Sequence, residues 1–260
     1  MSLPSLTPLQ STLSHLSRNV PRLLAVLTLL AACLVSTVVN PPKAHADACF
    51  TWGRTLSQGM SGEDVRQLQI RIAGYPGYGG HLALDGDFGP ATYAALKRFQ
   101  SAYGLSVDGI AGSQTYSKLY ALQHDDCTPI HFAYSEMDDG CGGSGFDGGP
   151  LSAADAKFNA LRVMWQLEAL RHALGDRALY IASGFRSYSC NNQVGGASNS
   201  MHLYGKAADL TGSPSLCTLA KQARYHGFGG IFGPGYPGHN DHTHVDIRTD
   251  NVWDAPNCGI

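Results

Sequence analysis

The chain has 260 residues, of which 43% are hydrophobic and 15% are charged, which is enough apolar sequence for one large or two modest folded domains. This composition excludes long disorder, and a formal net charge of −2 without a basic patch excludes a nucleic-acid-binding protein. The 31 Gly and 13 Pro indicate many turns between short elements.

The first 46 residues have the composition of an export signal. They contain no Asp or Glu, and two Arg precede an apolar run over 23–39 that is followed by the small-residue triplet Ala-His-Ala. This order predicts a signal peptide over residues 1–46, with release after Ala46. Two alternatives remain open: a membrane anchor, because the run approaches a bilayer-spanning length, and lipidation at Cys33, which follows Leu-Ala-Ala. After removal of the signal we expect no membrane attachment.

An internal repeat occupies residues 52–122. The sequence D-G-D-F-G-P-A-T at 85–92 recurs as D-G-I-A-G-S-Q-T at 108–115, and a related unit begins at Gly59. In each copy the two Gly mark a tight turn, and the Thr lies in a short helix. The pattern predicts three short helices around a shared core, with these members: Val65, Leu68, Ile72, Phe99 and Leu105.

The repeat region resembles the peptidoglycan-binding domain of wall hydrolases. The matching motifs are G-x-x-G-x-x-V-x-x-L-Q, D-G-x-F-G, F-Q-x-x-x-G-L and D-G-x-x-G-x-x-T. The resemblance implies that this module binds peptidoglycan, and its lack of a His cluster or acidic pair favours binding over catalysis. A helical bundle without a ligand is the alternative.

The rest of the chain alternates helix and strand after a linker that we place within the Gly-, Ser- and Asp-rich segment 125–150. Ser152 is the predicted N-cap of a helix that runs to about Leu174. We expect this helix to carry one apolar stripe, formed by Leu161, Trp165, Leu167 and Leu170.

The elements that follow predict an α+β domain with a short antiparallel sheet. They are a strand at 178–182, a helix at 215–225 and a last strand at 244–247, with His242 as an alternative start. The predicted fold class is therefore two domains, a small all-α three-helix module over 47–127 followed by an α+β domain over 128–260.

Four His residues gather in two short stretches, 200–209 and 238–245. Neutral imidazole and carboxylate are the zinc ligands expected where Cys is oxidised, and a catalytic site needs three of them plus water. His202, Asp209 and His244 supply such a set. Surface or core His residues without a metal are one alternative, and a structural zinc site, which usually has four ligands rich in Cys, is another.

Spacing indicates how these side chains come together. Gly205 interrupts a regular helix or strand between His202 and Asp209, so we expect a turn that brings the two side chains together. On a strand, His242 and His244 face the same way. Asp241 then faces the other way unless it lies in the turn before the strand.

Both stretches resemble the zinc D-alanyl-D-alanine peptidases. The matching motifs are G-F-R-S at 184–187, S-x-H-x-x-G-x-A-x-D at 200–209 and D-H-T-H at 241–244, and the likeness extends over nearly all of the chain after the signal. It implies hydrolysis of the terminal D-Ala-D-Ala bond of peptidoglycan peptides by a secreted, cell-wall-associated monomer. It also implies one Zn²⁺ per chain, bound by His202, Asp209 and His244.

The resemblance further implies roles for the remaining site residues. Asp241 stands where relatives often carry Glu and is the expected general base, and its shorter side chain leaves His239 or His242 to share the proton transfer. Arg186 is expected to hold the substrate carboxylate or the developing oxyanion. An endopeptidase that cuts inside wall peptides and a non-catalytic wall-binding protein are the rival functions.

Six Cys follow the predicted signal peptide, and an even number in an exported chain predicts disulfides. None of the six lies in a C-x-x-C pair, which argues against a thiolate zinc site. The resemblance implies that consecutive Cys are paired: Cys49 with Cys127, Cys141 with Cys190, and Cys217 with Cys258.

Overall fold

The computed structural model describes residues 49–138 and 145–260, which form one compact unit. The predicted signal peptide, Cys33 and Cys141 therefore lie outside the described residues. Within the described ranges, the helices are all too short or too polar to cross a membrane.

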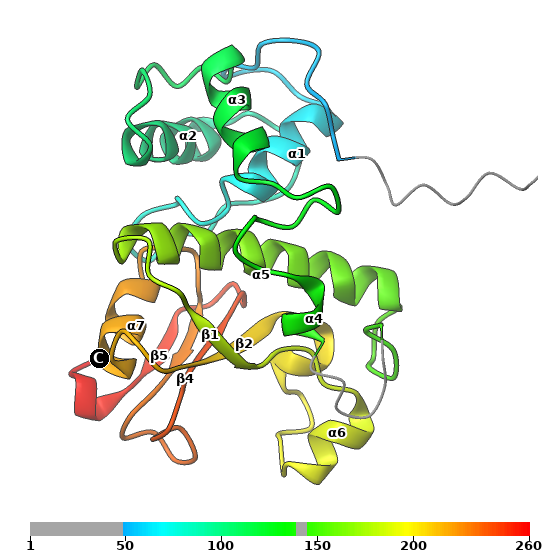
Figure 1. The fold of residues 1–260 in the computed structure, drawn as a ribbon, viewed down its shortest axis with the longest axis vertical. Helices are drawn as coiled ribbons and strands as arrows, with labels where there is room; N and C mark the ends of the chain where they lie inside the picture. Colours follow the sequence, from blue (N-terminus) through cyan, green and yellow to red (C-terminus); the bar gives the residue numbers. More distant parts are fainter. Residues whose placement is uncertain (1–48, 139–144) are drawn as a thin grey trace, which may run out of the picture. The chain divides into compact units, whose positions relative to one another are not determined.

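Three short helices form the first part of the fold, as the sequence predicts (Figure 1): α1 (Glu63–Arg71), α2 (Pro90–Ala102) and α3 (Ser113–Ala121). Each begins directly after a Gly N-cap, and α2 has Pro at its first position, where the missing N–H costs no hydrogen bond. The predicted core is confirmed. Four of its members are fully buried, and Leu105 is partly buried against them.

A buried glutamine amide closes each copy of the repeated D-G-x-x-G-x-x-T turn. Gln100 Nε2 donates to Asp108 Oδ1 at 2.9 Å and to the Ile110 carbonyl at 3.0 Å, and it lies 3.4 Å from Thr115 Oγ1. Gln100 Oε1 accepts a hydrogen bond from the Gly109 amide at 2.9 Å. Gly109 has φ +71°, a conformation that favours Gly.

Gln69 makes the same contacts in the first copy. Its Nε2 donates to Asp85 Oδ1 at 2.8 Å and to Thr92 Oγ1 at 3.1 Å, and its Oε1 accepts from the Gly86 amide at 2.9 Å. The repeat in the sequence is therefore explained by a repeated hydrogen-bond network that holds each turn against the preceding helix.

The long helix α5 (Ala153–Ala173) packs against two hydrophobic cores. Ser152 caps it by accepting from the Asp155 amide at 3.1 Å, so the predicted helix bounds are confirmed. Trp165 packs with the core of the three short helices, whereas Leu167 and Leu170 pack with the core beneath the sheet. The expectation of one apolar stripe is wrong, because α5 lies between two layers and buries residues on both sides (Figure 1).

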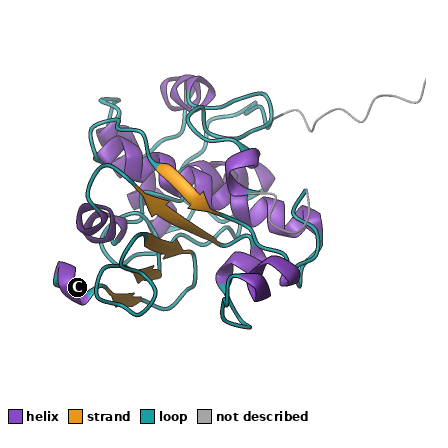
Figure 2. Cartoon of the chain, turned by 60° about the horizontal axis from the view of Figure 1, so that its bottom comes forward, coloured by secondary structure: helices purple, strands orange, loops and turns teal. Residues whose placement is uncertain are grey.

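A five-stranded sheet follows, with strand order β1-β2-β4-β3-β5. Its strands are drawn in orange in Figure 2. Its strands are β1 (Tyr180–Ser183), β2 (Ala207–Thr211), β3 (Gly230–Phe232), β4 (Thr243–Asp246) and β5 (Val252–Asp254). The predicted last strand is β4, but the chain continues into β5, which pairs with β3 in parallel. The sheet is thus antiparallel except at this edge, and the α+β class is confirmed.

Short helices and disulfides complete the fold. The helices are α4 (Tyr134–Met137), α6 (Tyr188–Gln193), α7 (Leu216–Ala223) and the 3₁₀ helices η1 (Met201–Tyr204) and η2 (Pro256–Cys258). Disulfides join Cys49 to Cys127 and Cys217 to Cys258. Cys190 is also disulfide-bonded.

Gln100→Glu tests the role of the amide in the second turn. We expect this change to lower the free energy of unfolding by about 2–3 kcal/mol, because a carboxylate replaces the buried donor and faces the Asp108 carboxylate. Denaturant unfolding of the full chain measures the loss. Gln114→Glu, at an exposed position of α3, adds the same charge and serves as the control. Equal stability of the two variants would contradict the role given to Gln100.

Candidate metal centre and active site

Three ligand atoms converge at the centre of the sheet. His202 Nε2 lies 3.1 Å from Asp209 Oδ1 and 3.1 Å from His244 Nδ1, and the last two atoms are 2.9 Å apart. All three residues are buried. Two zinc–ligand bonds at a tetrahedral angle place their ligand atoms about 3.3 Å apart. The triangle therefore has the size and the donor chemistry of three ligands to one zinc ion.

Local structure explains why these residues meet. His202 lies in η1, and Gly205 ends that helix with φ +67° before the chain enters β2. A Cβ at Gly205 would collide with the Ala156 carbonyl, so only Gly fits the turn. Asp209 on β2 then pairs in register with His244 on β4. The turn predicted between His202 and Asp209 is confirmed.

A further set of contacts orients the two imidazoles. His202 Nδ1 lies 2.5 Å from the Gly184 carbonyl, and His244 Nε2 lies 3.0 Å from Asp246 Oδ2. These contacts leave His202 Nε2 and His244 Nδ1 for a metal, an arrangement common in zinc sites. Sequence reasoning missed Asp246. The available signal was its position two residues after His244, on the same face of β4.

The electrostatics favour ionised carboxylates and a neutral His202, whereas at His244 the effect of burial is outweighed by hydrogen bonds with Asp209 and Asp246, which raise its pKa. Burial raises the pKa of Asp209, but contacts with His202 and His244 outweigh it and hold this pKa well below its usual range. For Asp246, burial is likewise outweighed by hydrogen bonds from His244 and Arg248, which lower its pKa. Burial lowers the pKa of His202, which favours the neutral form that a metal ligand requires.

Arg186 contacts the centre directly. It follows β1, and its Nη2 donates to Asp209 Oδ2 at 2.5 Å while its Nε donates to Ser183 Oγ at 2.8 Å. The guanidinium therefore lies on the carboxylate oxygen that is turned away from the ligand triangle.

A cavity of about 540 Å³ opens onto the ligand triangle. Its wall includes the three ligand candidates and three further residues singled out in the sequence, Arg186, His239 and His242. Sequence reasoning missed other lining residues, among them Phe232, Tyr236 and Arg248. Phe232 lies on β3, and Tyr236 lies in the loop after it. With three residues, β3 is too short for its sequence pattern to be recognised.

The candidates for proton transfer lie in the turn before β4. His242 Nε2 is 3.6 Å from Asp209 Oδ1, and its Nδ1 is 2.7 Å from Asp241 Oδ1. The Asp241 side chain is 88% exposed and lies outside the cavity wall. The His239 ring lies 4.7 Å from the His242 ring, centroid to centroid. The structure thus brings His242 to the ligand triangle and places Asp241 behind it.

Two family descriptions match separate parts of the chain. Residues 61–119 match the putative peptidoglycan-binding domain, and residues 130–246 match Peptidase M15. The two matches correspond to the three short helices and to the part of the chain that carries the ligand triangle.

Individual relatives match either nearly all of the chain or a smaller share of it. The zinc D-Ala-D-Ala carboxypeptidase of Streptomyces albus G is 56% identical over 237 residues, which are 91% of this chain and 92% of that protein. A spore cortex-lytic enzyme of Bacillus cereus is 38% identical over 40% of this chain and 39% of its own length. An N-acetylmuramoyl-L-alanine amidase of Bacillus licheniformis is 48% identical over 24% of this chain and 19% of its own length.

The first of these relatives is similar along nearly its entire length, and the ligand triangle lies within the matched peptidase region. The chain therefore belongs to the M15 peptidases, in the family of the zinc D-Ala-D-Ala carboxypeptidase of Streptomyces albus G.

Proposed function

We propose that this protein is a zinc-dependent carboxypeptidase that hydrolyses the terminal D-Ala-D-Ala bond of peptidoglycan peptides. The observation that carries the proposal is the buried triangle of His202, Asp209 and His244 at the base of a substrate-sized cavity. Family membership supports the chemistry, and the peptidoglycan-binding domain supports the substrate.

In this proposal His202, Asp209 and His244 hold the zinc ion. A zinc ion held there would supply Lewis-acid chemistry, polarising the scissile carbonyl and lowering the pKa of a water molecule towards ~7. The protein keeps the ligands in place through the Gly184 carbonyl behind His202 and the Asp246 carboxylate behind His244. Three protein ligands beside an open cavity are typical of a catalytic rather than a structural zinc site.

Arg186 is assigned to the developing oxyanion. Its guanidinium is fixed on Asp209 and Ser183, next to the ligand triangle, so it requires little reorganisation when negative charge develops there. A planar cation with several N–H donors is suited to that role.

Proton transfer is assigned to the pair formed by Asp241 and His242. The Nε2 atom of His242 faces the ligand triangle, so we assign it to take the proton from the attacking water and to deliver it to the leaving amine. Asp241 holds His242 through Nδ1 and stabilises the protonated imidazole. His239 lies beside this pair and is the second imidazole available to it.

The proposal also includes the location of the protein, which is outside the cell and at the cell wall. A signal peptide over residues 1–46 would release the chain as a secreted monomer, and the peptidoglycan-binding domain would hold it at the cell wall. The support is the order of basic, apolar and cleavage-site residues in that segment, together with the matched domain.

The proposed reaction is tested with a soluble peptide that ends in D-Ala-D-Ala. We expect the zinc-loaded protein to release D-alanine, a chelator to abolish the release, and added zinc to restore it. The same peptide ending in D-Ala-L-Ala is the control substrate. A protein that contains zinc and leaves the first peptide intact would exclude the proposed function.

Asp241→Asn and His242→Gln test the proton-transfer pair. Neither residue is assigned as a ligand, so both variants should keep wild-type zinc content while kcat falls on the order of 10²–10⁴-fold. His244→Ala should lose zinc, because two ligands hold the ion poorly. His124→Gln, at an exposed position, is the control. Near-normal turnover by Asp241→Asn would remove it from the pair, and loss of zinc from that variant would make it a ligand.

Asp246→Asn tests the support of His244. We expect zinc affinity to fall roughly 10- to 100-fold, the usual effect of removing a carboxylate behind a ligand imidazole. Competition with a chromogenic chelator measures the affinity. Asp250→Asn, at an exposed position in the following loop, should bind zinc like the wild type. Unchanged affinity in Asp246→Asn would mean that the strand alone orients His244.

A further inference from the structure

Two guanidinium groups line the active-site cavity, and the described residues of its wall include no Lys. One is Arg186, whose Nη2 and Nε are bonded to Asp209 and Ser183. The other is Arg248, which the proposed chemistry does not use. A peptide with a free carboxyl end brings one negative charge into this cavity besides the charge that develops on the scissile carbonyl. The cavity thus offers one cation for each of the two charges.

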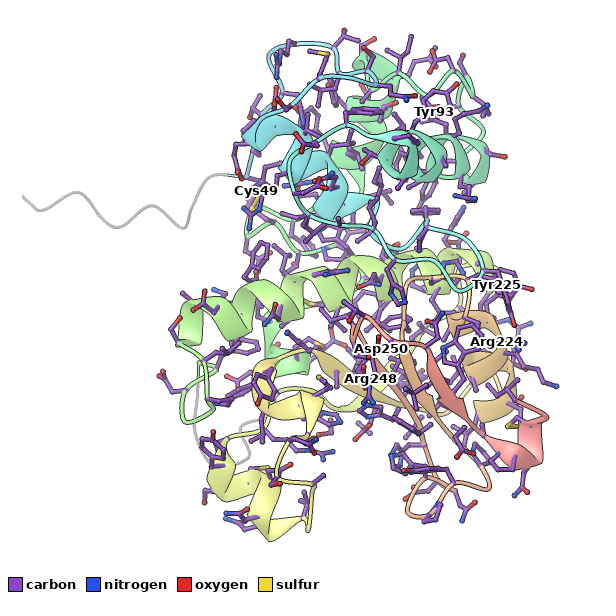
Figure 3. The ribbon with its side chains drawn as sticks, turned by 180° about the vertical axis from the view of Figure 1, so that it is seen from behind. Cys49, Tyr93, Arg224, Tyr225, Arg248 and Asp250 are labelled. Carbon is purple, nitrogen blue, oxygen red and sulfur yellow. A yellow bond between two sulfur atoms is a disulfide. The ribbon has the colours of Figure 1, made fainter. Side chains whose placement is uncertain are left out.

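Arg248 continues the line of residues that starts at His244. His244, Asp246 and Arg248 are spaced two residues apart, and successive members of the line are in contact. Asp246 is fully buried and accepts hydrogen bonds from Arg248 Nε at 2.8 Å and from Nη2 at 2.6 Å. Figure 3 labels Arg248 where the chain leaves the sheet after β4.

The Arg248 guanidinium is fixed but not enclosed. Its Cζ lies 5.2 Å from the centre of the Phe232 ring, and its side chain keeps 27% of its surface exposed. The bonds to Asp246 use Nε and Nη2, and no described residue forms a hydrogen bond with Nη1. An arginine held by a buried carboxylate on one edge, with its other edge available in a cavity, is suited to bind a second carboxylate end-on.

A carboxypeptidase needs its carboxylate-binding group in the same cavity as the metal ligands. In a carboxypeptidase substrate, a single residue separates the scissile bond from the terminal carboxylate, and one residue spans about 3.5 Å. Arg248 lines the same cavity as the ligand triangle and is connected to the ligand His244 through the Asp246 carboxylate, so it lies beyond the triangle on the side of Asp246. Arg186 lies directly on the ligand carboxylate of Asp209, next to the ligand triangle where the proposed function assigns it to the oxyanion.

We propose that Arg248 binds the terminal carboxylate of the substrate and thereby selects peptides that end one residue after the scissile bond. This inference rests on the proposed function, because it specifies which side chain makes the enzyme an exopeptidase. It also assigns a separate role to each arginine. Arg186 stabilises the oxyanion, and Arg248 binds the terminal carboxylate.

The experiment compares two peptides that differ at one group: an N-acylated peptide that ends in D-Ala-D-Ala, and the same peptide with a C-terminal amide. The wild type should prefer the free acid. In Arg248→Gln, kcat/KM for the acid should fall roughly 10- to 100-fold, mainly through KM, because the contact is present in the ground state as well as in the transition state. Hydrolysis of the amide should fall much less than hydrolysis of the acid, so the acid-to-amide ratio should collapse.

Controls separate binding from folding. Arg248→Lys keeps a positive charge beside Asp246 and should give an intermediate ratio, which keeps the test valid if the Gln variant does not fold. Arg177→Gln, at an exposed position after α5, should keep the wild-type ratio. Zinc content and the unfolding midpoint are measured for every variant.

The outcomes are distinct. An Arg248 variant that holds zinc and keeps the wild-type ratio would overturn the inference. An equal loss on both peptides would overturn it too, because it would indicate a role through Asp246 and His244. Failure of the wild type to cleave the acid peptide would contradict the proposed function itself.

Discussion

The register between β2 and β4 is the constraint on which the active site depends. Asp209 and His244 lie opposite each other across these two antiparallel strands, and His202 reaches them from the turn that precedes β2. A slip of one residue would turn either side chain to the opposite face of the sheet. Because both strands are buried, their register is fixed as well as their stability. This register is the one that brings the three ligand atoms together.

This arrangement places several charges in the interior, and each one has a partner. Asp209 is bonded to Arg186, and Asp246 is bonded to Arg248 and His244. A buried charge without a partner costs several kcal/mol, roughly 3–5 when one member of a pair is removed. The site therefore has little tolerance for loss of one member, which explains why cations and carboxylates follow one another so closely along β4 and the residues after it.

Much of this site could be predicted from the sequence, because its chemistry is concentrated in two stretches. His202, Asp209 and His244 were identified by residue type and spacing, and Gly205 predicted the turn between the first two. Asp246 and Arg248 were not identified, because the two-residue spacing from His244 to Asp246 indicates a shared strand face but not which nitrogen the carboxylate contacts. The positions of Asp241 and His242 relative to the cavity also depend on a turn whose conformation the sequence does not specify.

The fold, like the site, could be predicted only in part from the sequence. Gly turns and helical spacing predicted the three short helices, and Ser152 marked the start of α5. The three-residue strands β3 and β5 are too short to give a recognisable alternation, so the parallel edge of the sheet was missed. The two faces of α5 were missed as well, because hydrophobic spacing shows that a helix is buried but not how many layers cover it.

The shared use of α5 has a consequence for how such proteins can be recombined. Trp165 and Ala169 complete the core of the peptidoglycan-binding helices, while the opposite side of the same helix completes the core of the peptidase. A different wall-binding domain placed before this peptidase would leave Trp165 without its packing partners unless it offered a matching apolar face. Exchange of the wall-binding module is thus limited here by side-chain packing on one helix.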